Sequence, residues 1–171
     1  PQGKNFKAQQ FTPDYLCPEG HGQQPEEMGE DQDRFALAVI LFQLFNNGLH
    51  PYQGIPLTTN TNALPTDISG RIASGAYAYG LKPSSLQSPH AMSIHEYFED
   101  NTRVLFDRAF SDKPSLRPSS EEWLRHLDKL IETGTLQTCT LNPREHAHYS
   151  KGCGFCVVEG GGSLTRPTQK A

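Results

Sequence analysis

The segment from Gln32 to Phe45 constrains the fold most, because its fourteen residues contain no glycine or proline. Apolar residues occupy nearly every helical face of this segment, a pattern typical of a buried helix rather than a surface one. A strand is conceivable for residues 39–42 alone, but a segment of this length favours a helix. Asn46, Asn47 and Gly48 then supply a helix stop. We therefore predict a central buried helix over residues 32–46.

Other helix signals are shorter and are separated by long loops. Ser119 and Glu122 form a capping-box pattern, and apolar residues then recur at helical spacing, which predicts a last helix over residues 119–133. A short helix is expected at 67–74. A further helix is expected to start near Ser93 and to end near Ser111. The fold class predicted from these signals is mainly α.

Composition excludes several classes of function. The formal net charge is −4, and no run of Lys or Arg exceeds two residues, so we expect no nucleic-acid partner. No apolar stretch approaches the ~20 residues that span a bilayer, so we expect no membrane partner. The start of the chain has neither an initiator Met nor an apolar signal core, which indicates a trimmed chain or one that begins inside a longer one. The few, unevenly placed cysteines favour a reducing cytoplasm.

Four motifs occur in a recognisable order. Residues 12–19 read TPDYLCPE, residues 33–39 read DRFALAV, residues 48–52 read GLHPY and residues 112–119 read DKPSLRPS. These resemble, respectively, the end of a protein-kinase activation segment, the start of the central kinase helix, the turn after it, and the approach to the last kinase helix. Together they make residues 11–133 similar to the C-terminal lobe (C-lobe) of bacterial Ser/Thr protein kinases, with the end of the activation segment at 11–20.

The resemblance implies structural roles for five residues, which are Thr12, Pro18, Glu19, Asp33 and Arg117. In the family the motif carboxylate, here Glu19, pairs with the late arginine, here Arg117, and pins the activation segment to the helical core. Asp33 is expected to cap its helix. The sequence departs from the family pattern at Cys17, where Ala is usual, and at Ala38, where Gly is usual. Both departures are conservative in size.

The resemblance does not extend to catalysis in this chain. Phosphoryl transfer needs a glycine-rich loop, a catalytic Asp and a metal-binding Asp, and no G-x-G-x-x-G, H-R-D or D-F-G motif occurs here. We therefore expect no catalytic or ATP-binding residue in these 171 residues. ATP and Mg would bind only if the parent protein supplies the missing upstream half, which comprises the N-lobe and the segments before the activation loop; the N-lobe of the longer parent is also an expected partner. The expected role is a lobe that binds a protein substrate or partner; the alternative is a pseudokinase-type binding scaffold stabilised by zinc.

Three cysteines near the end of the chain, at positions 139, 153 and 156, predict a metal site. Their C-x13-C-x2-C spacing places two thiolates on one tight turn, and a histidine completes a Cys3His structural zinc site. His146 is the favoured fourth ligand and His148 the alternative. A redox pair or plain reduced thiols are the other interpretations, but no strand followed by a helix start is predicted there.

These predictions divide the chain into three parts. A kinase C-lobe-like region is expected over residues 1–134, a zinc knuckle over 135–158 and a flexible tail over 159–171.

Overall fold

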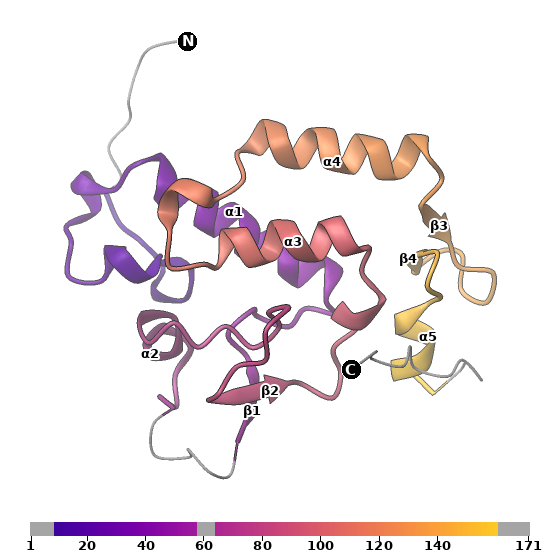
Figure 1. Cartoon of the computed structure of the whole chain (residues 1–171), viewed down its shortest axis with the longest axis horizontal. Helices are drawn as coiled ribbons and strands as arrows, with labels where there is room; N and C mark the ends of the chain where they lie inside the picture. The colour runs from indigo at the N-terminus through magenta and orange to yellow at the C-terminus, as the bar shows by residue number, and fades with distance from the viewer. Residues whose placement is uncertain (1–8, 58–63, 161–171) are drawn as a thin grey trace.

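Helices form most of the fold (Figure 1). The computed structural model describes residues 9–57 and 64–160. Its α-helices are α1 (Glu30–Phe45), α2 (Ile68–Ala73), α3 (Asp100–Ala109), α4 (Ser120–Glu132) and α5 (Gly154–Val158). Two short antiparallel strand pairs complete it, β1 (Gly54–Pro56) with β2 (Gln87–Pro89) and β3 (Leu136–Thr138) with β4 (Ala147–Tyr149). The predicted mainly α class is confirmed. No helix among the described residues is long and apolar enough to cross a membrane.

Helix α1 is the central element, and it begins at Glu30, two residues before the predicted start. It ends as expected, because Asn46 is the C-cap and Asn47 and Gly48 adopt left-handed backbone conformations with φ of 55° and 74°. One face of the helix is fully buried. The opposite face is not, since Ile40 is 47% exposed and Leu44 is 70% exposed. The prediction that α1 is buried on all sides is therefore wrong for this face.

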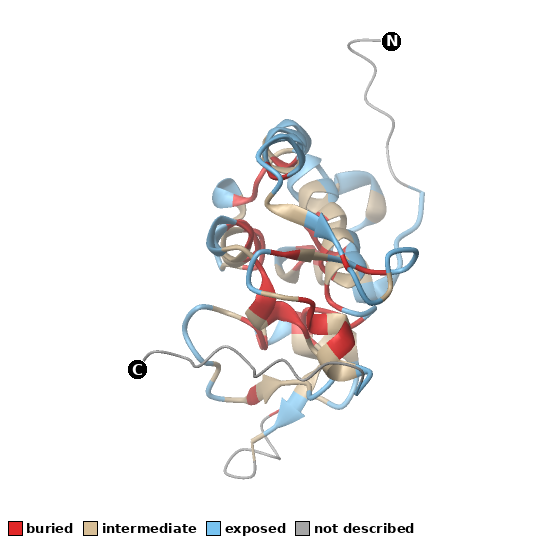
Figure 2. Cartoon of the chain, turned by 90° about the vertical axis from the view of Figure 1, so that its right-hand side faces the viewer, coloured by how far each residue is buried: buried red, intermediate tan, exposed pale blue. Residues whose placement is uncertain are grey.

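Aromatic rings hold the helices together around α1. The Phe42 ring lies 5.0 Å from the ring of Phe106 on α3, and Phe106 in turn lies 5.0 Å from Trp123 on α4. Tyr79, from the loop before β2, contacts the other side of Phe42 at 5.0 Å. Figure 2 shows the buried residues gathered in the middle of the molecule, with α4 largely exposed along its outer side. One aromatic core therefore links α1, α3 and α4.

Side-chain caps start α2, α3 and α4, and one of these starts was predicted at the wrong residue. Asp67 accepts a hydrogen bond from the Gly70 amide at 2.8 Å and caps α2, which lies within the helix expected at 67–74. The helix predicted to begin at Ser93 instead begins at Asp100. The reason is that the Glu99 carboxylate caps it, while residues near Ser93 form a single 3-10 turn over His95–Tyr97. Serine is a common N-cap residue, so the sequence predicts a helix start at Ser93, but the residue that caps the helix is Glu99.

The last helix starts as predicted, but its capping box is incomplete. Ser119 accepts a hydrogen bond from the Glu122 amide at 3.2 Å. The Glu122 carboxylate is bound by Arg108 on α3, with Nη2 3.1 Å from Oε2, so it faces α3. Helix α4 is therefore tied to α3 by this surface ion pair as well as by Trp123.

The segment after α4 packs against the residues before α3 through the start of α5. A Cβ atom added at Gly154 would lie 2.7 Å from Ile94 Cβ and 2.8 Å from Tyr97 Cδ2. Lys151 strengthens this contact because its ammonium donates to the Phe98 carbonyl oxygen at 3.0 Å and pairs with Asp100 at 2.6 Å. The flexible tail predicted from residue 159 lies outside the described residues beyond Gly160.

We expect the Gly154→Ala substitution to destabilise the chain by about 1–2 kcal/mol, because overpacking costs more than the helix gains from alanine. Helix propensity alone would favour alanine by up to about 1 kcal/mol, so a loss of stability identifies the contact with Ile94 and Tyr97 as its cause. Urea denaturation measures the change, with Ser150→Ala in the exposed turn as the control. A stability gain for Gly154→Ala would contradict this packing.

Candidate metal centre

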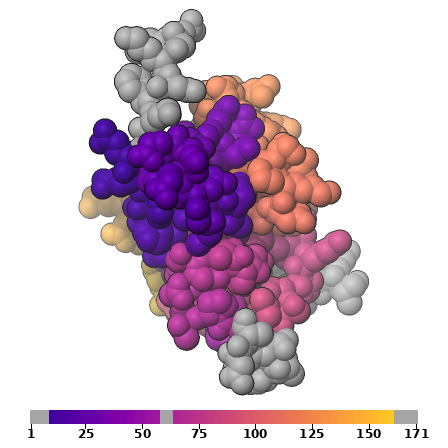
Figure 3. All heavy atoms as spheres, turned by 90° about the vertical axis from the view of Figure 1, so that its left-hand side faces the viewer, coloured from indigo at the N-terminus to yellow at the C-terminus, as the bar shows by residue number. Residues whose placement is uncertain are grey.

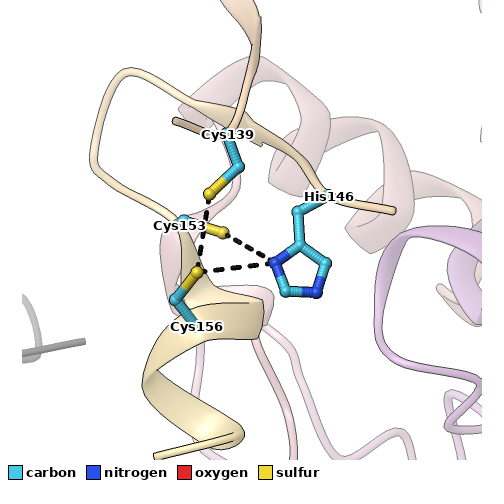
Figure 4. A group of neighbouring side chains, drawn as sticks. All are labelled: Cys139, His146, Cys153 and Cys156. Carbon is cyan, nitrogen blue, oxygen red and sulfur yellow. Dashed lines mark hydrogen bonds between the residues drawn. The ribbon is translucent and has the colours of Figure 1, made fainter. Parts of the chain in front are cut away.

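Two local structures bring the predicted metal ligands together (Figure 4). The β3–β4 pair aligns Thr138 with Ala147, and the Cys139 amide donates to the His146 carbonyl oxygen at 3.0 Å just beyond it. This pairing places one cysteine and one histidine opposite each other. Cys153 is the N-cap of α5 and Cys156 lies within that helix, so the C-x2-C pair enters from the other side.

The spacing of the four ligand atoms fits one tetrahedral ion. The Sγ atoms of Cys139 and Cys156 are 3.5 Å apart, and His146 Nδ1 lies 3.4 Å from Cys156 Sγ and 3.7 Å from Cys153 Sγ. All four ligand atoms lie within 4.8 Å of one another. Zinc bonds of about 2.3 Å to sulfur and about 2.0 Å to nitrogen, in a tetrahedron, require neighbouring ligands roughly 3.5–3.8 Å apart. The residues therefore form a potential metal site of the geometry that zinc prefers.

The structure separates the two candidate histidines. His146 is buried and points Nδ1 at the thiols, while its Nε2 lies 3.1 Å from Glu159 Oε1. A carboxylate on the far nitrogen of a ligating histidine fixes the ring orientation and raises its basicity. His148 is not in the cluster, because its Nδ1 contacts the Tyr149 carbonyl oxygen at 2.7 Å. The favoured histidine of the sequence prediction is the one that joins the cysteines.

The electrostatics of the thiols differ between the two local structures. Backbone amides of Asn142 and Leu141, near Cys139, lower the pKa of its thiol to about 6. Burial raises the pKa of Cys156, and the neighbouring thiols raise it further, because a second thiolate beside the first is unfavourable. A cation bound among them would reverse that repulsion and hold the thiols deprotonated. The donor set therefore suits a divalent cation.

The sequence disfavours a redox role for the C-x2-C pair, partly because it predicts no helix start at these cysteines. The structure does place Cys153 at the start of α5, four residues after β4 ends. The setting alone thus resembles that of a redox pair. However, Cys139 and His146 converge on the same point, and all four residues are buried, whereas redox-active thiols are partly exposed. The arrangement favours metal binding.

A second group of predicted residues lies at the other end of α1, where Glu19 and Arg117 are in contact. Arg117 is 2% exposed, and its Nη2 donates to Glu19 Oε2 at 2.8 Å while Nη1 binds the other carboxylate oxygen. Arg117 also donates to the Asp31 and Ala109 carbonyl oxygens, at 3.1 and 3.3 Å, and its guanidinium lies 5.2 Å from the centroid of the Phe35 ring. It thus joins the N-terminal segment, α1 and α3.

The other three predicted motif residues make weaker contributions. Pro18 begins the 3-10 turn Pro18–Gly20, which carries Glu19. Thr12 is exposed and makes no side-chain cap to the turn that follows it. The prediction that Asp33 caps its helix is wrong. The helix begins earlier, with Gly29 at the N-cap, so Asp33 lies exposed within the first turn, where its charge favours the helix dipole.

One residue that sequence reasoning missed, Gln32, clamps the N-terminal segment to α1. Gln32 accepts from the Cys17 amide at 2.8 Å and donates to the Tyr15 carbonyl oxygen at 2.7 Å. In the space-filling view the indigo N-terminal residues lie against the magenta residues around α2 and the orange residues between α3 and α4 (Figure 3). Glutamine at the start of a helix carries no distinctive signal, because its role here depends on tertiary placement.

Comparison with known proteins finds one relative twice. The chain is 30% identical over 149 residues to "Protein kinase YegI" of Escherichia coli O157:H7, which covers 81% of this chain and 21% of that protein. It is 29% identical over 145 residues to the K12 protein of the same name, again covering 81% and 21%. This homology supports a kinase-like relation. The chain spans about a fifth of the length of these curated relatives, and no family model matches it.

Proposed function

We propose that this chain is the C-lobe part of a bacterial Ser/Thr protein-kinase-like protein, in which it binds a protein substrate or partner. The observation that carries the proposal is the pair between buried Arg117 and Glu19, which holds the segment at residues 12–20 against α1. The family resemblance predicts that pair from four motifs. The 30% identity to a protein kinase supports the same assignment.

Phosphoryl transfer in this proposal belongs to the longer protein. The chain has no glycine-rich phosphate loop, catalytic Asp motif or D-F-G motif, so ATP and Mg would be bound by the upstream half of the longer protein, that is, by its N-lobe and the segments before the activation loop. A structural zinc ion held by Cys139, His146, Cys153 and Cys156 would stabilise the end of the lobe. The few, unevenly placed cysteines suit a cytoplasmic protein.

The uncovered face of α1 supports a larger assembly. Ile40 and Leu44 are one helical turn apart and are 47% and 70% exposed on α1, the most hydrophobic of the three long helices α1, α3 and α4. Contiguous apolar surface of this kind is typical of an interaction site. We infer that the rest of the longer protein packs on this face and makes α1 the fully buried helix that its sequence predicts.

Leu44→Asp tests this inference. In the 171-residue chain we expect a change in unfolding free energy within about 0.5 kcal/mol, because the site is exposed. In the longer protein we expect a loss of at least about 2 kcal/mol, because the carboxylate would be buried without a partner. Leu44→Met, which keeps the side chain apolar, is the control in both contexts. Chemical denaturation of both variants, each in the 171-residue chain and in the longer protein, gives the comparison. Equal small effects of Leu44→Asp in both contexts would contradict the proposal.

Nucleotide binding distinguishes an active kinase from the pseudokinase-type scaffold. An active parent is expected to gain thermal stability with Mg-ATP by mass action and to transfer phosphate, while the isolated chain gains none. A scaffold would show the Leu44→Asp effect without phosphoryl transfer.

A further inference from the structure

A large pocket with both polar and apolar lining lies away from both the metal centre and the Arg117 pair. Its volume is about 830 Å³, within the range of small-molecule sites, and its described lining comes from β2, the loop at 78–84, the start of α3 and Lys151. None of the residues that carry the proposed kinase-like assignment line it. This pocket therefore has no role in the function proposed above.

Arg103 on α3 lines this pocket, and one of its side-chain donors has no partner among the described residues. Its Nε atom is buried and has no hydrogen-bond partner among the described residues, and its guanidinium forms none of the ion pairs found there. A guanidinium offers five donors in a planar fork that matches an oxyanion. Leaving such a donor buried and unpaired costs free energy, so native arginines in this position usually meet a partner.

The acidic neighbours of Arg103 are already engaged elsewhere. Asp107 accepts the Leu81 amide at 3.0 Å, and Asp100 pairs with Lys151 at 2.6 Å. The charge of Arg103 tends to lower the pKa of both carboxylates, although neither forms an ion pair with it among the described residues. His95, also in the lining, is buried, and burial together with Arg103 lowers its pKa to about 4, so it is neutral at pH 7. Arg103 is thus the one lining cation, among the described residues, without an ion-pair partner.

The rest of the lining decides the kind of molecule that fits. Leu57, Leu81 and Pro83 supply apolar surface, and Leu81 is 49% exposed. Glu96 adds one carboxylate, which opposes a bare anion. The pocket is larger than a free phosphate or acetate ion needs. We propose that this pocket binds an oxyanion, a phosphate or a carboxylate, carried on an apolar or aromatic body, with Arg103 as the residue that binds the oxyanion.

Titration of the 171-residue chain with phenyl phosphate, benzoate, inorganic phosphate and acetate tests the proposal. We expect saturable binding of an aromatic oxyanion, tighter than that of the corresponding free anion, with a shift of the Arg103 Nε–H signal in NMR spectra. Arg103→Gln is expected to weaken binding at least about tenfold, since it removes a charge-assisted contact. Arg125→Gln removes an exposed arginine on α4 and is the matched control. Glu96→Gln is expected to tighten binding by removing the opposing charge.

The result separates the possible anions and can overturn the site. Preference for phenyl phosphate indicates a phosphate monoester and preference for benzoate a carboxylate; both support the proposal. Binding that survives Arg103→Gln, or no saturable binding of any of the four compounds, overturns it. If Arg103→Gln fails to fold, Arg103→Lys keeps the charge and stem but removes the fork, and undiminished affinity in that variant also overturns the role of Arg103.

Discussion

We expect Cys139→Ser to abolish stoichiometric zinc binding and to lower the unfolding free energy by at least about 3 kcal/mol, because structural zinc binding is coupled to folding. In isolated zinc fingers such coupling reaches roughly 10–16 kcal/mol. The loss here is expected to be smaller, since Gly154 and Lys151 also hold the knuckle to the lobe. Metal analysis of the purified chain and urea denaturation with and without a chelator measure both quantities.

Two histidine variants control this experiment. His146→Gln is expected to lose zinc in the same way, because its Nδ1 is the fourth ligand atom of the cluster. His148→Gln is expected to keep about one zinc ion per chain, because His148 lies outside the cluster and its Nδ1 contacts the Tyr149 carbonyl oxygen. The assignment fails if His148→Gln loses the metal while His146→Gln keeps it, or if the wild-type chain binds no zinc.

The knuckle could be predicted because its signal is local. A C-x2-C pair fixes two thiols on one turn whatever the rest of the chain does, so spacing alone identified Cys153 and Cys156. The choice between His146 and His148 is harder, because strand alternation would place residues two apart on the same face; what separates them is that β4 begins at Ala147, after His146 and before His148. The helix start at Cys153 was missed because α5 has only five residues, too few for a periodic pattern.

The helical region from α1 to α4 shows a different limit of prediction from sequence. Apolar continuity located α1, but it could not show that Ile40 and Leu44 stay exposed in this chain, since the same pattern fits burial by residues outside it. The capping pattern at Ser119 located α4 because that cap is local. Gln32 and Arg103 carry no sequence signal, because their contacts or lack of contacts arise only when distant segments pack together.

We expect Arg117→Met to lower the unfolding free energy by about 3–5 kcal/mol, because it removes a buried guanidinium that binds the partly exposed Glu19 and leaves two carbonyl oxygens without this donor. Methionine keeps much of the packing against Phe35, so the loss reports polar contacts more than volume. Glu19→Gln is expected to cost less, about 1–2 kcal/mol, because the Glu19 side chain is 37% exposed and solvent screens its charge. Urea denaturation at neutral pH ranks the two variants.

A surface pair and the pH dependence test the cause. Arg108→Met removes a similar contact to Glu122, but those side chains are 36% and 35% exposed, so we expect a loss of at most about 1 kcal/mol.

Burial tends to raise the pKa of Glu19, yet hydrogen bonds from Arg117 outweigh it and lower the pKa below 4.5. The stability from this pair is therefore present above pH 4.5 and is lost as the pH falls through the lower folded-state pKa. The difference between wild type and Glu19→Gln should shrink over that range. A difference that stays constant in acid, or an Arg117→Met loss no larger than that of Arg108→Met, would show that the Glu19–Arg117 pair does not hold the N-terminal segment to α1.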